Sequence, residues 1–399
     1  MEKLFYEDQY IKEFIAEVIE VKEVNNQFHV KLDKTAFFPG GGGQQGDLGY
    51  LENCEVVDVY EEHGEIYHVT NVKPIKVHRI KGIIDWNRRI DGMQHHLAQH
   101  VLSGCFFSMF NANTVSVHVG KEISSVDIQG IIDEESIRKA EKRANEIIIE
   151  NIKVEFLTPN KNEAIKLGLR RDLPKTKEQI RVVKIGDLDI NACCGVHPKS
   201  TLALQAIKII KWEKHKGNTR IYYLAGGRAV NDYFNKEEFS KKICKFLNCG
   251  ESDAINSIKK LEKEVRDLKE VTRGLRVQIS EYEVKEMIDE AEKVNEALVI
   301  RKIYENIDLK YASKLAEKLV STGKVVVLLA IKTENRVNFI FASSKELNII
   351  SMSDLLKDAI SLIDGRGGGN NHLAQGAGKN SSSLDGAIDY AVKRVKDNL

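Results

Sequence analysis

Two histidines four residues apart are the first feature of this sequence that could carry chemistry. His96 and His100 fall on a predicted helix, because the apolar residues Met93, Leu97 and Val101 recur around them at helical spacing. Their imidazoles therefore project from one face, one turn apart, a spacing that suits two ligands of one metal ion. The alternative is a pair of core histidines on an apolar face. Two desolvated imidazoles each need a partner, however, and a metal ion supplies both.

A second pair lies almost a hundred residues further along the chain. Cys193 and His197, in NACCGVH, form a Cys-x-x-x-His pattern that can close a metal site from a turn. Alone this spacing is a weak signal. Together with the helix pair it supplies three nitrogens and one sulfur, a ligand set that suits Zn²⁺ and does not suit Mg²⁺ or Ca²⁺.

Two neighbouring residues are weaker candidates for the same site. Cys194 is a competing thiol, but Cys193 is the cysteine with a histidine four residues on. His95 lies about 100° around the helix from His96. We therefore expect His95 on the outer face of the helix or on the substrate side.

Two glycine-rich stretches could bring backbone close to a ligand. The first, FFPGGGGQQGDLG, covers residues 37–49, and the second, GRGGGNNHLAQGAG, covers residues 365–378. Four consecutive glycines in the first stretch remove the side chains that would keep a ligand away from backbone N–H groups. A flexible hairpin loop is the alternative interpretation of this segment alone.

The elements that must position these residues indicate an α+β protein with four parts. Residues 1–85 read as short alternating strands, typical of a small β-barrel or sandwich that carries the first glycine motif. Residues 86–234 alternate helices and strands and hold both candidate ligand pairs. Residues 235–296 are predicted to be a helical, coiled-coil linker. Residues 297–399 form a small C-terminal α/β domain with the second glycine motif.

The linker carries two apolar series with a period of seven residues. The series are Ile258, Val265, Thr272 and Ile279, and Leu261, Leu268, Leu275 and Tyr282. Thr272 on the seam and Gly274 beside it weaken a coiled coil, so we expect a short helical hairpin or dimer arm and not a long rod. The sequence thus predicts a homodimer formed through the C-terminal half.

Composition excludes several classes of protein. With 399 residues, 42% apolar and 30% charged, the chain is neither collagen-like nor wholly disordered. Sixty basic residues against 59 acidic ones leave a net charge of +1, so a nucleic-acid site must be local. The apolar run 325–331 is far shorter than the ~20 residues of a membrane helix. Six cysteines are too few for a disulfide scaffold, and we expect a cytoplasmic protein.

Four motifs, in order and spacing, resemble the editing domain of alanyl-tRNA synthetases and the freestanding alanyl-tRNA editing proteins of the AlaX type. They are TAFFPGGGGQQGD, HLAQH, RVVKIGD and CCGVH, and they span residues 35–197. The ending GRGGGNNHLAQGAG is similar to the C-terminal glycine-rich domain of the same family, which points to its long freestanding form. The family usually has Cys-Gly-Gly-Thr-His where this chain has CCGVH, so Cys194 and Val196 are departures.

The resemblance implies roles for individual residues. It implies that Zn²⁺ is held by His96, His100, Cys193 and His197. Thr35 matches a threonine that faces the amino-acid pocket, and Gln44 matches the glutamine that closes the glycine motif. We expect Gln44 and the backbone of Gly41, Gly42 and Gly43 to hold the terminal ribose and the ester.

A basic segment between Lys208 and Arg220 is the local signal for RNA. Five basic residues stand against Glu213, and an aromatic ring lies among them, so the segment could neutralise phosphates and stack on a base. A solvated hairpin is the alternative. The residues of this basic strip are Lys208, Lys211, Trp212, Lys214, Lys216 and Arg220.

The sequence therefore predicts a zinc-dependent hydrolase that removes serine, with glycine as a second candidate, from mischarged tRNA(Ala). One alternative is a metallohydrolase that acts on another small ester or amide. The other is a non-catalytic tRNA-binding or dimerisation factor with structural zinc. Loss of activity on removal of the tRNA body would exclude the first, and turnover would exclude the second.

Overall fold

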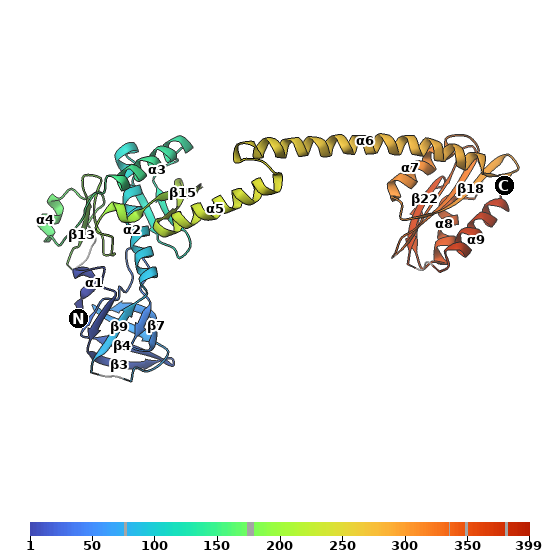
Figure 1. Cartoon of the computed structure of the whole chain (residues 1–399). Helices are drawn as coiled ribbons and strands as arrows, with labels where there is room; N and C mark the ends of the chain where they lie inside the picture. Colours follow the sequence, from blue (N-terminus) through green and yellow to red (C-terminus); the bar gives the residue numbers. More distant parts are fainter. Residues whose placement is uncertain (76–77, 174–178, 335, 348–349, 380–381) are drawn as a thin grey trace. The chain divides into compact units, whose positions relative to one another are not determined.

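A computed structural model describes residues 1–75, 78–173, 179–334, 336–347, 350–379 and 382–399, and it has the α+β class predicted from the sequence (Figure 1). These residues divide into two compact units, 1–251 and 252–399. The finer boundaries at residues 85, 234 and 296 remain predictions. No helix in the described part of the chain is long and apolar enough to cross a membrane.

The first strands form an open antiparallel sheet. Its edges, β2 and β3, do not pair with each other over these described residues, although Glu17 alone separates them. Glu17 hydrogen-bonds Asp33 instead. The sequence predicted a small β-barrel or sandwich, and strand pairing among the residues described does not close this sheet into a barrel. Alternation identifies the inward face of a sheet but not whether its edges meet. In sheet order the strands are β2 (Glu13–Ala16), β9 (Ile80–Ile84), β6 (Gly49–Leu51), β7 (Cys54–Glu62), β8 (Glu65–Thr70), β4 (Gln27–Leu32) and β3 (Val18–Val24).

A short N-terminal segment packs beside this sheet. Strand β1 (Glu2–Lys3) pairs in parallel with β5 (Lys34–Thr35), just before the glycine motif. Helix α1 (Leu4–Glu7) follows and buries Phe5 in the core of the sheet. The pairing thus ties the start of the chain to the segment that leads into the glycine motif.

Helix α2 (Trp86–Phe110) connects the sheet to a second core. Asp85 caps its start by accepting a hydrogen bond from the Arg88 backbone, and Asn111 ends it in the left-handed conformation. Met93 lies in the core of the first sheet, whereas Leu97 lies in the second core. The helix runs from one region to the other in Figure 1.

The second core lies between helices and a four-stranded antiparallel sheet. Helix α2 packs there with α3 (Glu134–Ile149), and α5 (Gly226–Leu247) follows the last strand. In sheet order the strands are β10 (Thr114–His118), β11 (Ser124–Ile128), β16 (Asn218–Ala225) and β15 (Ile207–His215).

A three-stranded sheet completes the first unit and carries the cysteine turn. Its order is β12 (Val154–Leu157), β13 (Val182–Ile185) and β14 (Asp189–Ala192), and Cys193 follows β14 directly. Helix α4 (Lys161–Lys166) follows β12, and the 3-10 helix η1 (Thr201–Leu204) lies after the turn. A second 3-10 helix, η2 (Glu251–Asp253), precedes the heptad segment.

The heptad residues lie on one uninterrupted helix, α6 (Ala254–Asp289). Thr272 and Gly274 do not break it, because one glycine costs a helix only about 1 kcal/mol and the Thr272 hydroxyl donates to the Leu268 carbonyl. A hairpin turn within the seam is therefore not formed. The seam is exposed, for example 48% at Leu261 and 64% at Leu268.

The C-terminal unit is a mixed sheet between two helical layers. Helices α8 (Met352–Ser361) and α9 (Leu384–Lys396) cover one face, and α7 (Leu309–Val320) with the end of α6 covers the other. Strand β19 contributes alternate residues to both cores, which explains its continuous apolar run. In order the strands are β17 (Glu292–Val294), β18 (Ala297–Glu305), β19 (Val325–Lys332), β20 (Val337–Ser343), β22 (Leu373–Gly378) and β21 (Arg366–Gly369).

Candidate metal centre and catalytic site

The four predicted ligands meet in one buried cluster. His96 and His100 come from successive turns of α2, and Cys193 and His197 come from the turn after β14. One potential ligand atom from each residue lies within 4.8 Å of those of the other three. The Cys193 Sγ atom is 3.4 Å from His96 Nε2 and 3.7 Å from His197 Nε2. The fold therefore joins the two pairs that the sequence separates by almost a hundred residues.

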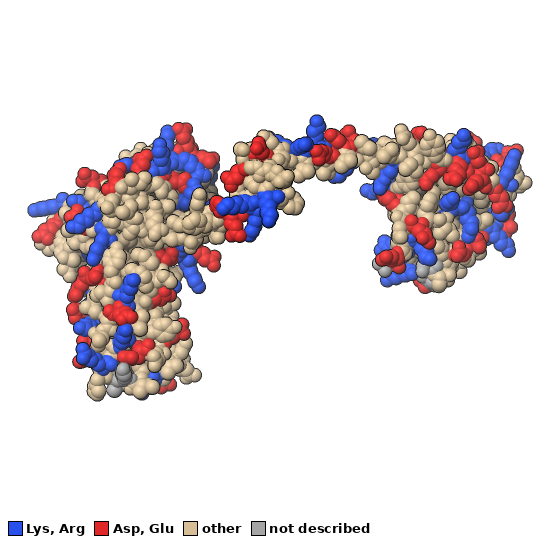
Figure 2. Space-filling view, viewed as in Figure 1, with Lys and Arg blue, Asp and Glu red and all other residues tan. Residues whose placement is uncertain are grey.

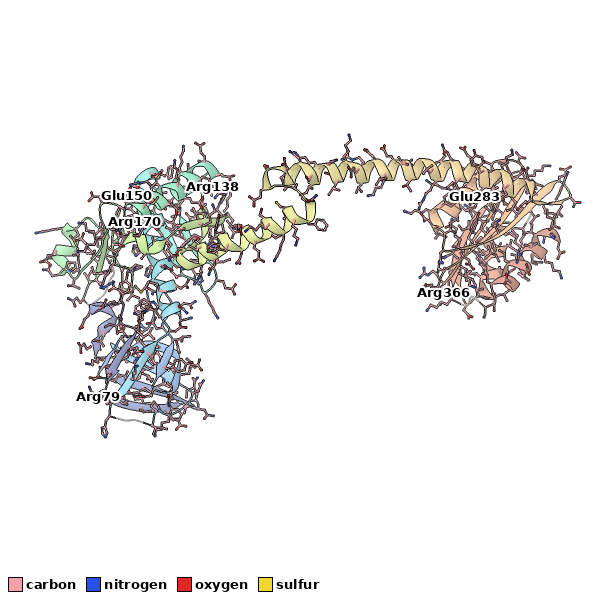
Figure 3. All side chains as sticks on the ribbon, viewed as in Figure 1. Arg79, Arg138, Glu150, Arg170, Glu283 and Arg366 are labelled. Carbon is pink, nitrogen blue, oxygen red and sulfur yellow. The ribbon has the colours of Figure 1, made fainter. Side chains whose placement is uncertain are left out.

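Neighbouring side chains orient both helix histidines. Asp189 Oδ2 lies 2.7 Å from His100 Nδ1, and Gln44 Oε1 lies 3.0 Å from His96 Nδ1. Each ring therefore donates from Nδ1, which leaves Nε2 as the nitrogen that a metal ion would bind. The Asp189 carboxylate is itself held by Arg170, labelled in Figure 3, whose Nε donates across 2.7 Å.

Two buried nitrogens of the cluster lack a hydrogen bond. His100 Nε2 and His197 Nδ1 have no partner among the described residues. An unsatisfied buried polar atom is costly, so such atoms mark a missing partner. A cluster of imidazoles and one thiol fits a metal ion that prefers nitrogen and sulfur ligands.

Protonation states agree with this assignment. Burial raises the pKa of the Cys193 thiol, but the His96 and His197 imidazoles outweigh it, so the pKa lies well below its usual value. Burial lowers the pKa of His197 to about 3, which keeps that ring neutral. Burial also lowers the pKa of His100, but Asp189 and Cys193 raise it to about 9. A metal ion would replace the His100 proton and bind a thiolate.

The first glycine motif lies against this cluster. Gly40, Gly41, Gly42 and Gly43 all have positive φ, from +61° to +144°. A Cβ atom on Gly42 would lie 3.1 Å from His96 Cε1 and 3.6 Å from Cys194 Sγ. The Gly43 carbonyl accepts a hydrogen bond from Val119 after β10. We expected the Gly41 backbone to hold the ribose and the ester. The Gly41 N–H instead donates to the Gln44 carbonyl, so it is not free to bind a ligand.

Gln44 and Thr35 have contacts that the sequence did not predict. The Gln44 side chain is buried, and its Oε1 accepts from both His96 and the Val196 N–H. Gln44 therefore orients a ligand. The Thr35 hydroxyl is fully buried, lies 2.8 Å from His68 Nε2 and accepts from the Phe37 N–H. Its described hydrogen bonds all lie within the first sheet, and none reaches the cluster.

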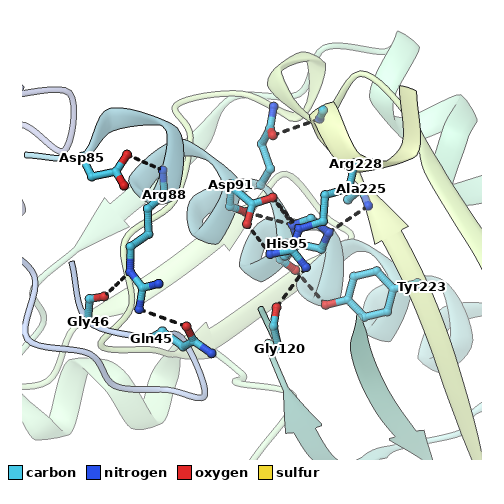
Figure 4. Close-up of polar contacts among 12 residues, drawn as sticks. Gln45, Gly46, Asp85, Arg88, Asp91, His95, Gly120, Tyr223, Ala225 and Arg228 are labelled. Atoms are coloured by element: carbon cyan, nitrogen blue, oxygen red, sulfur yellow. Dashed lines mark hydrogen bonds and ion pairs between the residues drawn. The ribbon is translucent and has the colours of Figure 1, made fainter. Parts of the chain in front are cut away.

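The face of α2 away from the cluster is anchored to β16 and α5 (Figure 4). His95 is buried, so of its two predicted positions, the outer face and the substrate side, the outer face is wrong. Its Nδ1 donates to the Asp91 carbonyl and its Nε2 accepts from the Ala225 N–H. Arg228 pairs with the Asp91 carboxylate. The Tyr223 hydroxyl donates to the His95 carbonyl, so three contacts from β16 and α5 fix the turn that precedes His96.

Three of the five basic residues of the strip form ion pairs, two of them with acidic residues of other elements. Lys208 pairs with Glu141 of α3, Lys211 with Glu213, and Arg220 with Asp127 of β11. The net charge predicted from this segment is thereby reduced, because sequence counting omits acids on neighbouring elements. Figure 2 shows both signs of charge interspersed over the visible surface of each unit.

The aromatic ring of the strip is also occupied. Trp212 packs partly against the second core, and Arg138 of α3 lies 4.8 Å from its ring centroid. Lys214 and Lys216 have no ion pair among the described residues, and they stay candidates for phosphate contact.

Sequence reasoning missed Asp189 and Arg170. A signal was present: Asp189 and Asn191 are polar residues at alternate, buried positions of a short strand that leads directly into the ligand turn. A buried aspartate two positions from another polar residue predicts a functional partner. The partner itself lies 89 residues away in sequence, so pattern alone could not identify His100.

Known protein families match both units. The model of the threonyl and alanyl tRNA synthetase second additional domain matches residues 180–222, which include the ligand turn. The DHHA1 domain model matches residues 295–397. The alanyl-tRNA editing protein AlaX-L of Pyrococcus horikoshii is 30% identical over 415 aligned positions, covering 100% of this chain and 99% of that protein. The chain belongs to this alanyl-tRNA editing protein family.

Longer relatives of the family extend the comparison. The alanine–tRNA ligase of Archaeoglobus fulgidus is 31% identical over 100% of this chain, which covers 44% of the ligase. The ligase of Pyrococcus furiosus is 32% identical over 99% of this chain and 43% of its own length. The chain thus spans less than half the length of each of these ligases.

Proposed function

We propose that this protein is a zinc-dependent aminoacyl-tRNA deacylase that hydrolyses Ser-tRNA(Ala), with Gly-tRNA(Ala) as a second substrate. The observation that supports it most is the His96, His100, Cys193 and His197 cluster with its unsatisfied nitrogens. Family membership supplies the class of substrate, since the AlaX-L relative is named an alanyl-tRNA editing protein.

The reaction needs little covalent help from the protein. A water oxygen attacks the carbonyl carbon, the bond to the ribose oxygen breaks, and the ribose oxygen takes up a proton. The products are the free amino acid and tRNA. Bound zinc would supply positive charge beside the ester. Because four protein ligands can fill a tetrahedral shell, that charge positions the substrate unless one ligand leaves.

The chain's own residues position the metal ligands and the substrate. Gln44 and Asp189 hold the histidine rings, and the loop passes so close to the cluster that a Cβ atom on Gly42 would lie 3.1 Å from His96 Cε1. A loop without side chains admits the flat terminal adenosine and its ester. Thr35 supports this arrangement through its hydrogen bond with His68 in the first sheet.

We propose that the tRNA body is held away from the cluster. Lys214 and Lys216 are the basic residues of the strip that form no ion pair with the described residues, and the unit that matches the DHHA1 model provides a second surface. A homodimer formed through the seam of α6 would present two copies of each surface. Such a protein would work in the cytoplasm, where tRNA is charged.

A single assay separates this function from its alternatives. Purified protein is incubated with Ser-, Gly- and Ala-tRNA(Ala) and with seryl esters of a short CCA oligonucleotide and of methanol. We expect rapid loss of the Ser-tRNA ester, slower loss from the oligonucleotide and no loss of Ala-tRNA. Equal turnover of the methyl ester would favour a general esterase. Tight tRNA binding without turnover would favour the non-catalytic factor.

A further inference from the structure

The turn that supplies two of the four proposed ligands has no regular backbone structure. Residues 193–198 belong to neither helix nor strand. In a helix or sheet the backbone hydrogen bonds would fix the distance between Cys193 and His197. Here, other groups must fix it.

Two side chains bind three consecutive carbonyl groups of this turn. Arg181 Nη1 donates to the Gly195 carbonyl at 2.7 Å and to the Cys193 carbonyl at 3.4 Å. The Tyr6 hydroxyl donates to the Cys194 carbonyl at 2.6 Å. These donors are far apart in the sequence of the first unit, since Tyr6 lies on α1 and Arg181 directly before β13.

The Arg181 guanidinium is itself held between two aromatic rings. Its central carbon lies 4.8 Å from the Tyr6 centroid and 4.6 Å from the Phe156 centroid. The Phe156 ring stacks on His197 at 6.3 Å. The Arg181 carbonyl also accepts from the Cys193 N–H at 2.9 Å. Arg181 thus contacts one end of the turn directly, at Cys193. At the other end it contacts Phe156, which stacks on His197.

We propose that Tyr6 and Arg181 are positioning residues that hold the turn from Cys193 to His197 in the shape that binds the metal ion. The inference rests on the proposed metal site. Burial raises the pKa of the Tyr6 phenol, so it stays a neutral donor. Cys194 is exposed, so water can replace the phenol at its carbonyl. Loss of the Tyr6 hydroxyl should therefore loosen the turn with little effect on folding.

The test measures zinc affinity of the full-length protein by competition with a chromophoric chelator. Tyr6→Phe removes one donor, and Arg181→Lys keeps the charge but loses the planar fork. The matched controls are Tyr60→Phe and Arg138→Lys. The Tyr60 hydroxyl hydrogen-bonds His29, and the Arg138 guanidinium lies over the Trp212 ring. We expect about tenfold weaker zinc binding in each test variant, as for other residues that orient metal ligands. The controls should stay within twofold of wild type.

Two further measurements keep the outcomes separate. Melting temperatures of the zinc-free proteins must match wild type, which shows that Tyr6→Phe folds. Arg181→Met removes the charge as well as the fork. Wild-type affinity in Tyr6→Phe would overturn the proposal, and so would wild-type affinity in Arg181→Lys with a loss only in Arg181→Met. Failure of the wild-type protein to bind zinc would overturn the proposed function as well.

Discussion

Single residues decide which nitrogen of each helix histidine faces the cluster. The Asp189 carboxylate accepts a hydrogen bond from Nδ1–H of His100, and the Gln44 amide oxygen accepts one from Nδ1–H of His96. A histidine that binds a metal through Nε2 is usually fixed in this way by an acceptor at Nδ1. The identity of the acceptor matters, because a carboxylate also compensates positive charge whereas an amide does not.

Asp189→Asn tests this orientation. The amide can turn its NH₂ group toward His100, and it loses the charge that Arg170 balances. We expect zinc affinity to fall about 10- to 100-fold, measured by chelator competition. Asp187→Asn changes an exposed aspartate two residues earlier and should bind zinc as the wild type does. Equal affinity in both variants would show that Asp189 does not orient the ligand.

His68 gives the first sheet a pH-dependent stability. Burial lowers its pKa from 6.5 to about 4, so the folded protein keeps it neutral while the unfolded chain takes up a proton below pH 6.5. Stability should therefore fall as the pH falls from 6.5 toward 4, by about 2 kcal/mol between pH 7 and pH 5. Urea unfolding of wild type and His68→Gln measures the difference. If the free energy of unfolding changed with pH in the same way in both proteins, His68 would not be the neutral partner of Thr35 in the folded protein.

At the scale of elements, the first glycine motif requires glycine for a reason beyond its own backbone. Gly42→Ala would place a Cβ atom 3.1 Å from His96 Cε1 at a φ of +61°. Gly64→Ala is a matched control, since φ is +81° there but no atom lies within 4 Å. Both variants carry the backbone strain of about 1–2 kcal/mol. We expect kcat/KM for deacylation of Ser-tRNA(Ala) to fall at least tenfold in Gly42→Ala and to stay unchanged in Gly64→Ala. Similar losses in both variants would exclude a contact with His96.

Local patterns in the sequence predict the elements that carry the site but not all of its contacts. Helical spacing placed His96 and His100 on one face of α2, because that face depends only on residues three and four apart. The edges of the first sheet, the burial of His95 and the acids that pair with the basic strip depend on residues distant in sequence. Thr35 shows the same limit, since its partner His68 lies on another strand.

For the whole molecule, we propose that the second unit binds tRNA and forms the dimer. Truncation after Glu251 removes this unit together with the exposed seam of α6. Because remote contacts chiefly supply uniform binding, KM for Ser-tRNA(Ala) should rise more than kcat falls. The sedimentation mass should fall from dimer to monomer, with zinc content unchanged. An unchanged KM and a truncated protein that stays dimeric would contradict this assignment.

The most direct test of the account joins metal content to turnover. Zinc-free protein is titrated with zinc while Ser-tRNA(Ala) deacylation and bound metal are followed in wild type, Cys193→Ala and Cys194→Ala. We expect activity to rise in wild type and Cys194→Ala until one zinc is bound per chain, whereas Cys193→Ala gains neither zinc nor activity. Full deacylation without zinc, or full zinc and activity in Cys193→Ala with loss of both in Cys194→Ala, would contradict the proposed metal centre.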